Sequence, residues 1–318
     1  MSTLRVAADT FYRGRLARLP AEVRLEWFDS LAGAVDAASD AEVLALGPDR
    51  GWPVADVVVS APHLRWVHTR AAGVDRGQMQ PLQVFRDRGI TVTNGSGISS
   101  VPIAEYVVMA MLAISRGLPG MLAAQGLREW VKPAATRELA GSHLLLLGFG
   151  DVGRTVWDRL QPFGVIGTAV RRWPGAESGP EIVGPAGWRP RLGEFDWVVA
   201  TTPLNRETRH LVGERELAAM QQHAWLINVS RGGVVDQRAL TTALRRSDIG
   251  GAWLDVTDPE PLPPDDELWS LPNAVITPHS SWQSPRFAER SGELLLDNLR
   301  HWCAGRPLRN VVDLEAGY

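Results

Sequence analysis

Short apolar runs alternate with polar turns along the whole chain. In the first hundred residues, the runs at 4–8, 43–46, 57–59, 64–68 and 91–93 are rich in β-forming residues and predict strands. Turns such as Gly47-Pro48-Asp49 and stretches of helical character separate them. Strands that alternate with helices predict a parallel sheet with helices on its faces.

A second block of the same kind begins at residue 143. The runs at 143–147, 165–170, 197–201, 224–228, 251–255 and 274–277 predict strands, and a helix is expected from about 151 to about 163. Residues 177–192 are rich in Gly and Pro and predict an exposed, irregular connection. The chain is therefore expected to hold two parallel α/β domains.

Residues 102–116 read as a helix that is apolar on nearly every side, which predicts burial between domains or between subunits. Pro102 suits a first helical turn, and Gly117 follows the last. The apolar stretch is shorter than the roughly 20 residues that a bilayer span needs, and the first residues lack an apolar signal region. We expect a cytoplasmic protein with no membrane partner.

The composition of the chain argues against several classes of partner and of site chemistry. The 318 residues suit roughly two domains of about 150 residues each, and a net charge of -3 gives no footprint for nucleic acid. Lys132 is the one lysine and Cys303 the one cysteine, so lysine-based covalent chemistry is disfavoured. Intrachain disulfides and multi-cysteine metal sites are excluded, and no metal is expected.

The residues after run 143–147 form a glycine-rich turn. They are Gly148, Phe149, Gly150, Asp151, Val152 and Gly153, which satisfy G-x-G-x-x-G between a predicted strand and a predicted helix. In such a turn the first glycine permits a tight bend, the second lets a pyrophosphate approach the backbone, and the third allows close packing. The helix N-terminus favours phosphate, so a dinucleotide site is predicted.

The next predicted strand ends in Arg171 and Arg172, where an acid that binds the adenosine ribose is usual in NAD(H) sites. Two guanidinium groups suit a 2′-phosphate, which favours NADP(H). The alternative is two solvated arginines in a chain whose 33 basic residues are all arginine but one, and NAD(H) then stays possible.

From about residue 71 to 308 the chain resembles the D-isomer-specific 2-hydroxyacid dehydrogenases. The motifs lie at 71–75 (AAGVD), 101–116, 148–153, 202–210, 227–236 (INVSRGGVVD), 254–261 and 272–279. The resemblance implies two doubly wound domains, with a Rossmann-type cofactor domain of residues 99–284 inserted into a flavodoxin-like substrate domain of 1–98 plus 285–318. It also implies an active site in the crevice between them and a homodimer through the helix at 102–116.

The resemblance further implies three catalytic positions, Arg231, Glu260 and His279. Their chemistry suits reduction of a 2-keto acid, which needs a proton donor for the carbonyl and a cation for the carboxylate. His279 is a natural donor near neutral pH, and Arg231 would hold the carboxylate. Glu260 would accept a hydrogen bond from the imidazole and keep it protonated.

Other contacts are implied by the same motifs. Asp255 would hold the nicotinamide carboxamide, and the cofactor would also meet Thr202, Pro203, Val229 and Ser230. The amides of Ala72, Gly73 and Val74 would take the substrate carboxylate, unless that segment is an ordinary surface turn. Trp282 departs from the small residues usual in the family after the histidine, and either shapes the substrate pocket or packs between domains.

We therefore expect an NADPH-preferring reductase of glyoxylate or hydroxypyruvate, or another small 2-keto acid. Two alternatives stay open at this point. One is a non-catalytic dinucleotide sensor similar to the related corepressors, and the other is a phosphite-type dehydrogenase on the same fold.

Overall fold

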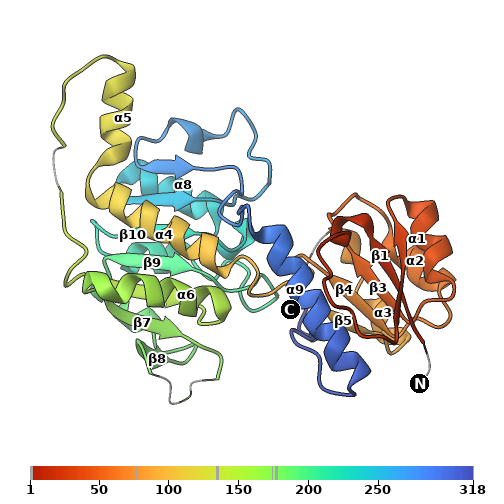
Figure 1. Ribbon diagram of the computed structural model, residues 1–318. Helices are drawn as coiled ribbons and strands as arrows, with labels where there is room; N and C mark the ends of the chain where they lie inside the picture. Colours follow the sequence, from red (N-terminus) through yellow and green to blue (C-terminus); the bar gives the residue numbers. More distant parts are fainter. Residues whose placement is uncertain (1–2, 76, 134–135, 174, 176–177, 318) are drawn as a thin grey trace. The chain divides into compact units, whose positions relative to one another are not determined.

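The computed structural model describes residues 3–75, 77–133, 136–173, 175 and 178–317. Two compact units appear, unit 1 from Met1–Ile98 with Ser284–Tyr318, and unit 2 from Ser99–Gln283. Each is built on a parallel sheet flanked by helices (Figure 1), which confirms the predicted fold class.

Unit 1 has a sheet of order β2-β1-β3-β4-β5, and all pairs are parallel. This is the flavodoxin-like order. Its strands are β1 (Leu4–Asp9), β2 (Val23–Phe28), β3 (Val43–Leu46), β4 (Trp66–Thr69) and β5 (Thr91–Thr93). One face is covered by α1 (Leu31–Ala38), α2 (Val54–Ser60) and α3 (Gln83–Asp87), and the other by η1 (Thr10–Tyr12) and α9 (Phe287–Cys303).

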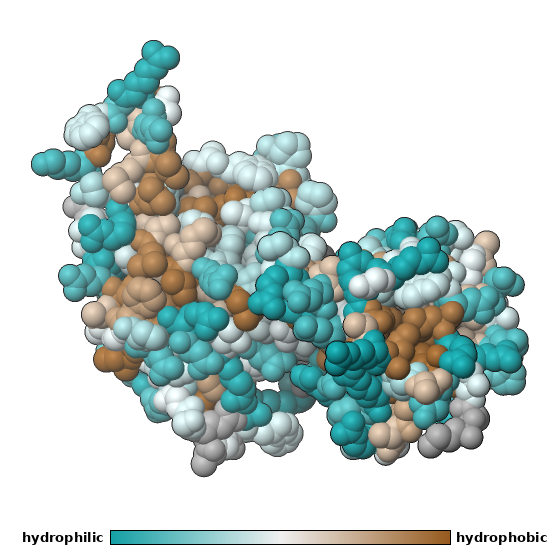
Figure 2. Space-filling view, in the orientation of Figure 1, coloured by the Kyte–Doolittle hydropathy of each residue, from teal (hydrophilic) through white to brown (hydrophobic). Residues whose placement is uncertain are grey.

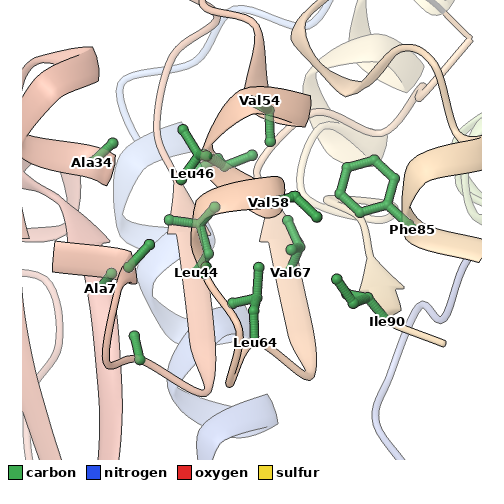
Figure 3. Packing of buried hydrophobic residues seen from close by; sticks show 14 of the residues in the cluster. Ala7, Ala34, Leu44, Leu46, Val54, Val58, Leu64, Val67, Phe85 and Ile90 are labelled. Atoms are coloured by element: carbon green, nitrogen blue, oxygen red, sulfur yellow. The ribbon is translucent and has the colours of Figure 1, made fainter. Parts of the chain in front are cut away.

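The core of unit 1 shows how side chains select a face. Leu44, Leu46 and Val67 lie on one side of the sheet and pack against Val54 and Phe85 (Figure 3). Val43 and Ala45 point to the opposite face, toward α9, as the two-residue repeat of a strand requires.

The prediction of a strand at 57–59 is wrong, because these valines belong to α2. Val54, Val57 and Val58 are buried at helical spacing, whereas Val59 is 70% exposed. A short apolar run does not reveal its own period. The more polar strand β2 was not predicted, since its buried ends, Val23 and Phe28, are separated by half-exposed or exposed residues.

Unit 2 has a seven-stranded parallel sheet of order β12-β11-β10-β9-β6-β7-β8. The strands are β6 (His143–Leu147), β7 (Ile166–Val170), β8 (Glu181–Val183), β9 (Trp197–Ala200), β10 (Trp225–Asn228), β11 (Gly251–Leu254) and β12 (Ala274–Ile276). On one face lie α4 (Ser100–Ser115) and α6 (Asp151–Leu160), and on the other α7 (Glu214–Ala219) and α8 (Gln237–Arg246). The strand order runs in opposite directions on the two sides of β6 and β9, which is the switch point where such sheets bind ligands.

The predicted irregular connection at 177–192 contains β8 and the start of η4 (Arg189–Glu194). Its first residue, Glu177, lies outside the described residues. Ile182 packs against the core beneath α6, which gives this short edge strand an apolar contact despite its Gly and Pro neighbours.

Helix α4 is only partly buried within the chain. Val107 and Met111 lie in the core, but Met109 is 47% and Leu112 37% exposed, so the chain alone does not bury every side of α4, and burial between subunits stays a prediction. Helix α5 (Leu118–Gly126) follows and stands out from the body of unit 2 (Figure 1), and apolar residues gather over this region (Figure 2). Among the described residues no single helix is long and apolar enough to cross a bilayer; α4 and α5 meet that test only together, and their axes are bent by 70°.

Candidate active site

The glycine-rich turn lies at the switch point of unit 2, directly after β6. Gly148 has φ +108°, and a side chain there would meet the backbone of Thr202 at 2.9 Å. A side chain on Gly153 would meet the carbonyl oxygen of Gly148 at 2.3 Å. Both positions therefore require glycine, one for its backbone conformation and close contact and the other for close contact.

Gly150 differs from its two neighbours, because a Cβ built on it has nothing within 4 Å. It is the N-cap of the ten-residue helix α6, and no side chain caps that end. The first N–H groups of the helix therefore have no side-chain cap, and the positive end of the helix dipole lies at a residue without a side chain. The turn fits the pyrophosphate of a dinucleotide, with Gly150 allowing its approach.

The arginines that follow β7 lie at the same edge of the sheet. The backbone N–H of Arg171 donates to the carbonyl of Val183 in β8, which fixes the start of this segment. Arg172 Nη2 is 2.5 Å from Glu207 Oε1, a pair whose side chains are 43% and 63% exposed. Glu207 follows β9, so this ion pair joins the segments after β7 and β9 beside the switch point.

Three neighbouring strands carry the predicted catalytic residues at their carboxyl ends. Arg231 follows β10, Glu260 follows β11 and His279 follows β12. Because the carboxyl ends of parallel strands meet at one edge, the sheet order itself brings these three segments together.

The side chains of His279 and Glu260 form a hydrogen bond. Nδ1 of the imidazole is 2.6 Å from Oε1 of the carboxylate, and the two side chains are 27% and 23% exposed. Since a carboxylate only accepts, Nδ1 carries the proton of this bond and Nε2 is the nitrogen directed elsewhere. The pair is shielded enough for a defined geometry and open enough to meet a ligand.

Arg231 is set by a turn that admits glycine only. Asn228 Nδ2 donates to its carbonyl at 2.9 Å, and a side chain on Gly232 would lie 2.0 Å from the carbonyl oxygen of Thr257. The turn after β10 therefore packs directly on the backbone that leads to Glu260. Arg231 itself is half-buried, and its Nη1 donates to the carbonyl of Ser230 at 2.9 Å.

Asp255, at the end of β11, is 1% exposed. Its Oδ1 accepts from Thr277 Oγ1 at 2.7 Å and from the N–H of Ser280 at 2.9 Å, and its Oδ2 accepts from the N–H of Ser281 at 3.0 Å. The carboxylate therefore holds both sides of the turn that carries His279. Sequence reasoning did not find this role, and the predicted contact with the nicotinamide carboxamide stays a prediction.

The remaining cofactor positions line the same edge. The backbone of Thr202 lies where a side chain on Gly148 would be, and the carbonyl of Pro203 accepts from Thr208 Oγ1 at 2.6 Å. Val229 is buried, with its N–H on the carbonyl of Ala200, and Ser230 bonds to the side chain of Asn228. Trp282 is half-buried in the turn after His279, and its place in a substrate pocket stays a prediction.

In unit 1 the segment Ala72–Val74 follows β4. The carbonyl of Ala71 accepts from the N–H of Gly95 at 2.8 Å, and that of Ala72 accepts from Asn94 Nδ2 at 2.7 Å. In a trans peptide the C=O and N–H groups point in opposite directions, so the N–H groups of Ala72 and Gly73 face away from the Asn94–Gly95 segment. Successive N–H groups of this kind suit an anion.

Within the described parts of the chain, no cluster of His, Cys, Asp and Glu is arranged to hold a metal ion.

A dinucleotide turn at the switch point, with an arginine and a hydrogen-bonded histidine–glutamate pair at neighbouring strand ends, defines a dinucleotide-dependent dehydrogenase. The family model described as "D-isomer specific 2-hydroxyacid dehydrogenase, NAD binding domain" matches residues 108–281. The chain belongs to this family, and it is an NAD(P)-dependent oxidoreductase of 2-hydroxy and 2-keto acids.

Relatives support the same assignment. The chain is similar to a glyoxylate reductase of Korarchaeum cryptofilum, with 34% identity over 272 residues that cover 82% of this chain and 80% of the relative. A D-isomer specific 2-hydroxyacid dehydrogenase family protein from Aeromonas salmonicida has a TM-score of 0.83 and 29% identity, with 98% of this chain and 99% of that chain covered. A D-isomer specific 2-hydroxyacid dehydrogenase from Xanthobacter autotrophicus, in complex with NADPH and MES, has a TM-score of 0.82 and 26% identity over the whole of both chains.

Proposed function

We propose that this enzyme reduces a small 2-keto acid of the glyoxylate or hydroxypyruvate type to the D-2-hydroxy acid, with NADPH as the preferred reductant. The observation that carries the proposal is the 2.6 Å bond between His279 and Glu260, on strand ends next to that of Arg231. The imidazole, hydrogen-bonded to a carboxylate, supplies the proton that reduction of a 2-keto acid needs. The guanidinium nearby supplies the cation for the carboxylate of that acid.

When bound, the nicotinamide cofactor supplies the hydride. His279 gives the proton on Nε2 to the carbonyl oxygen, while its Nδ1–H remains on Glu260. The carboxylate of Glu260 keeps the imidazole oriented by accepting the hydrogen bond from its Nδ1–H. Arg231 binds the substrate carboxylate and the oxygen that gains charge, and the amides of Ala72, Gly73 and Val74 hold the carboxylate as well. In the oxidative direction His279 takes the proton back.

The preference for NADPH rests on Arg171 and Arg172. The ion pair of Arg172 with Glu207 is largely exposed, and such pairs contribute about 0–1 kcal/mol. A 2′-phosphate carries more charge and more acceptor oxygens than a carboxylate, so it competes well for Arg172. The similar Xanthobacter protein was crystallised with NADPH. We assign the phosphate to these two arginines, and the rest of the dinucleotide to the glycine-rich turn, Thr202, Pro203, Val229, Ser230 and Asp255.

We also propose that two copies of the chain associate through α4 and α5. Met109 and Leu112 on α4, Leu118 and Leu122 on α5, and Leu127 directly after α5 are 37–72% exposed, and together they are called the apolar surface of these two helices. A second copy is the simplest cover for such a surface, because the same patch then serves both partners.

The substrate and cofactor are tested together in one panel. We expect the wild-type enzyme to turn over glyoxylate and hydroxypyruvate faster with NADPH than with NADH at equal concentrations. Arg171→Ala with Arg172→Ala is expected to lower kcat/KM for NADPH about 10²- to 10⁴-fold, because two charged hydrogen bonds are lost and each is worth about 1.5–3 kcal/mol, and to leave NADH almost unchanged. Arg238→Ala, on the exposed side of α8, is the matched control.

A larger kcat/KM with NADH than with NADPH would refute the reading of the two arginines. Absence of turnover on the whole panel, in protein that binds NADPH, would refute the proposed substrate class.

A further inference from the structure

A line of hydrogen bonds runs from the body of unit 2 to the turn of His279. Trp253 Nε1 in β11 is 2.7 Å from Tyr106 Oη in α4, and Tyr106 Oη bonds to Thr277 Oγ1. Thr277 Oγ1 is 2.7 Å from Asp255 Oδ1. None of these side chains had a role in the sequence predictions except Asp255.

The direction of each bond is fixed by the chemistry of its ends. An indole N–H only donates, and the carboxylate of Asp255 only accepts. Tyr106 Oη therefore accepts from Trp253 and donates to Thr277, and Thr277 donates to Asp255. Burial raises the pKa of Tyr106, so its hydroxyl keeps the proton that this order requires.

The line ends on the backbone of the proton donor. Besides the hydroxyl of Thr277, the carboxylate of Asp255 accepts hydrogen bonds from the N–H groups of Ser280 and Ser281. The backbone carbonyl of Asp255 accepts from the N–H of His279 at 2.8 Å. His279 has φ +49°, a left-handed conformation that is uncommon for residues other than glycine. Such a conformation persists only where its surroundings enforce it, and here the bonds to Asp255 do so.

We propose that Thr277 and Tyr106 are positioning residues, which orient the Asp255 carboxylate and thereby hold the His279 turn in its reactive conformation. The inference rests on the proposed role of His279 as proton donor. Asp255 is almost fully buried, so water does not replace a donor that is removed, and its carboxylate shifts toward the donors that remain. A shift of the turn by a fraction of an ångström moves the imidazole relative to the substrate carbonyl, and reaction rates are sensitive to that distance.

The test compares Thr277→Val, which keeps the shape and removes the hydroxyl, with Thr277→Ser, which keeps the hydroxyl. We expect Thr277→Val to lower kcat of NADPH-dependent glyoxylate reduction about 10- to 100-fold, with KM for glyoxylate within about twofold. Thr277→Ser is expected to restore most of kcat, and Tyr106→Phe to lower it by less than Thr277→Val. Thr242→Val, which removes a hydroxyl bonded within α8, is the matched control.

A double-mutant cycle separates positioning from general damage. In a His279→Ala background, Thr277→Val is expected to cause no further loss, because both changes act through the same imidazole. Equal losses in both backgrounds, an equal loss in Thr277→Ser, or a wild-type kcat in Thr277→Val would overturn the proposal. If Thr277→Val fails to fold, a wild-type kcat in Tyr106→Phe has the same consequence. Wild-type turnover in His279→Ala alone would instead overturn the proposed function.

Discussion

Single residues in the glycine-rich turn have separable tasks. The backbone of Gly148 curves against Thr202, Gly153 lets α6 approach β6, and Gly150 leaves space above the helix N-terminus. The G-x-G-x-x-G pattern predicts the turn, but it does not say which glycine serves the fold and which serves the ligand. The distances to a built Cβ make that distinction.

Gly153→Ala is therefore expected to lower stability, whereas Gly150→Ala is expected to lower the affinity for NADPH. In Gly153→Ala the new methyl would lie 2.3 Å from a backbone oxygen, and we expect a loss of about 1–3 kcal/mol in the free energy of unfolding by urea. In Gly150→Ala the methyl has room, so the change in stability should stay within about 0.5 kcal/mol. NADPH should bind Gly150→Ala about tenfold or more weakly, because the methyl occupies the space that the pyrophosphate needs. Wild-type NADPH affinity in Gly150→Ala would contradict this assignment.

At the scale of elements, α4 and α5 have an apolar surface that the chain itself leaves uncovered (Figure 2). Burial of a leucine side chain contributes about 1.5–3 kcal/mol, so covering several such residues favours association of two copies. The sequence predicted α4 and its apolar character. It did not predict which side of α4 faces the core, because apolar residues occupy both sides.

Leu122→Asp is expected to convert the proposed dimer to monomers, since it places a charge on the exposed apolar side of α5. Sedimentation velocity at several concentrations measures the change. Val59→Asp is the matched control, because Val59 is a similarly exposed aliphatic residue on α2 of unit 1. A monomeric wild-type protein, or a Leu122→Asp variant that sediments as a dimer, would refute the proposed association.

How far the sequence predicts the site depends on how local each feature is. Arg231, Glu260 and His279 each follow a predicted strand within a motif, so their common edge follows from a parallel sheet. The line from Trp253 to Tyr106 and Thr277 had no such signal, because Tyr106 lies 147 and 171 residues away from its two partners. Apolar runs such as 57–59 failed for a different reason, since three residues do not distinguish a strand from a turn of helix.

At the scale of the whole molecule, two parallel sheets with different strand orders divide the work. The seven-stranded sheet of unit 2 gathers the glycine-rich turn, the two arginines after β7 and the proposed catalytic residues at one edge. The sheet of unit 1 ends β4 in the segment Ala72–Val74, whose amides we assign to the substrate carboxylate. Hydride transfer with a histidine as acid needs neither lysine nor cysteine, which agrees with a chain that has one of each.

The most direct test of the proposed mechanism is a single-turnover measurement of NADPH oxidation by glyoxylate in wild type and in His279→Ala. The control is His143→Ala, because His143 begins β6 at the end opposite to the glycine-rich turn. We predict that the rate of the chemical step falls about 10²- to 10⁴-fold in His279→Ala alone, while the Kd for NADPH stays the same. An unchanged rate in His279→Ala would contradict the assignment of the proton donor and, with it, the proposed mechanism.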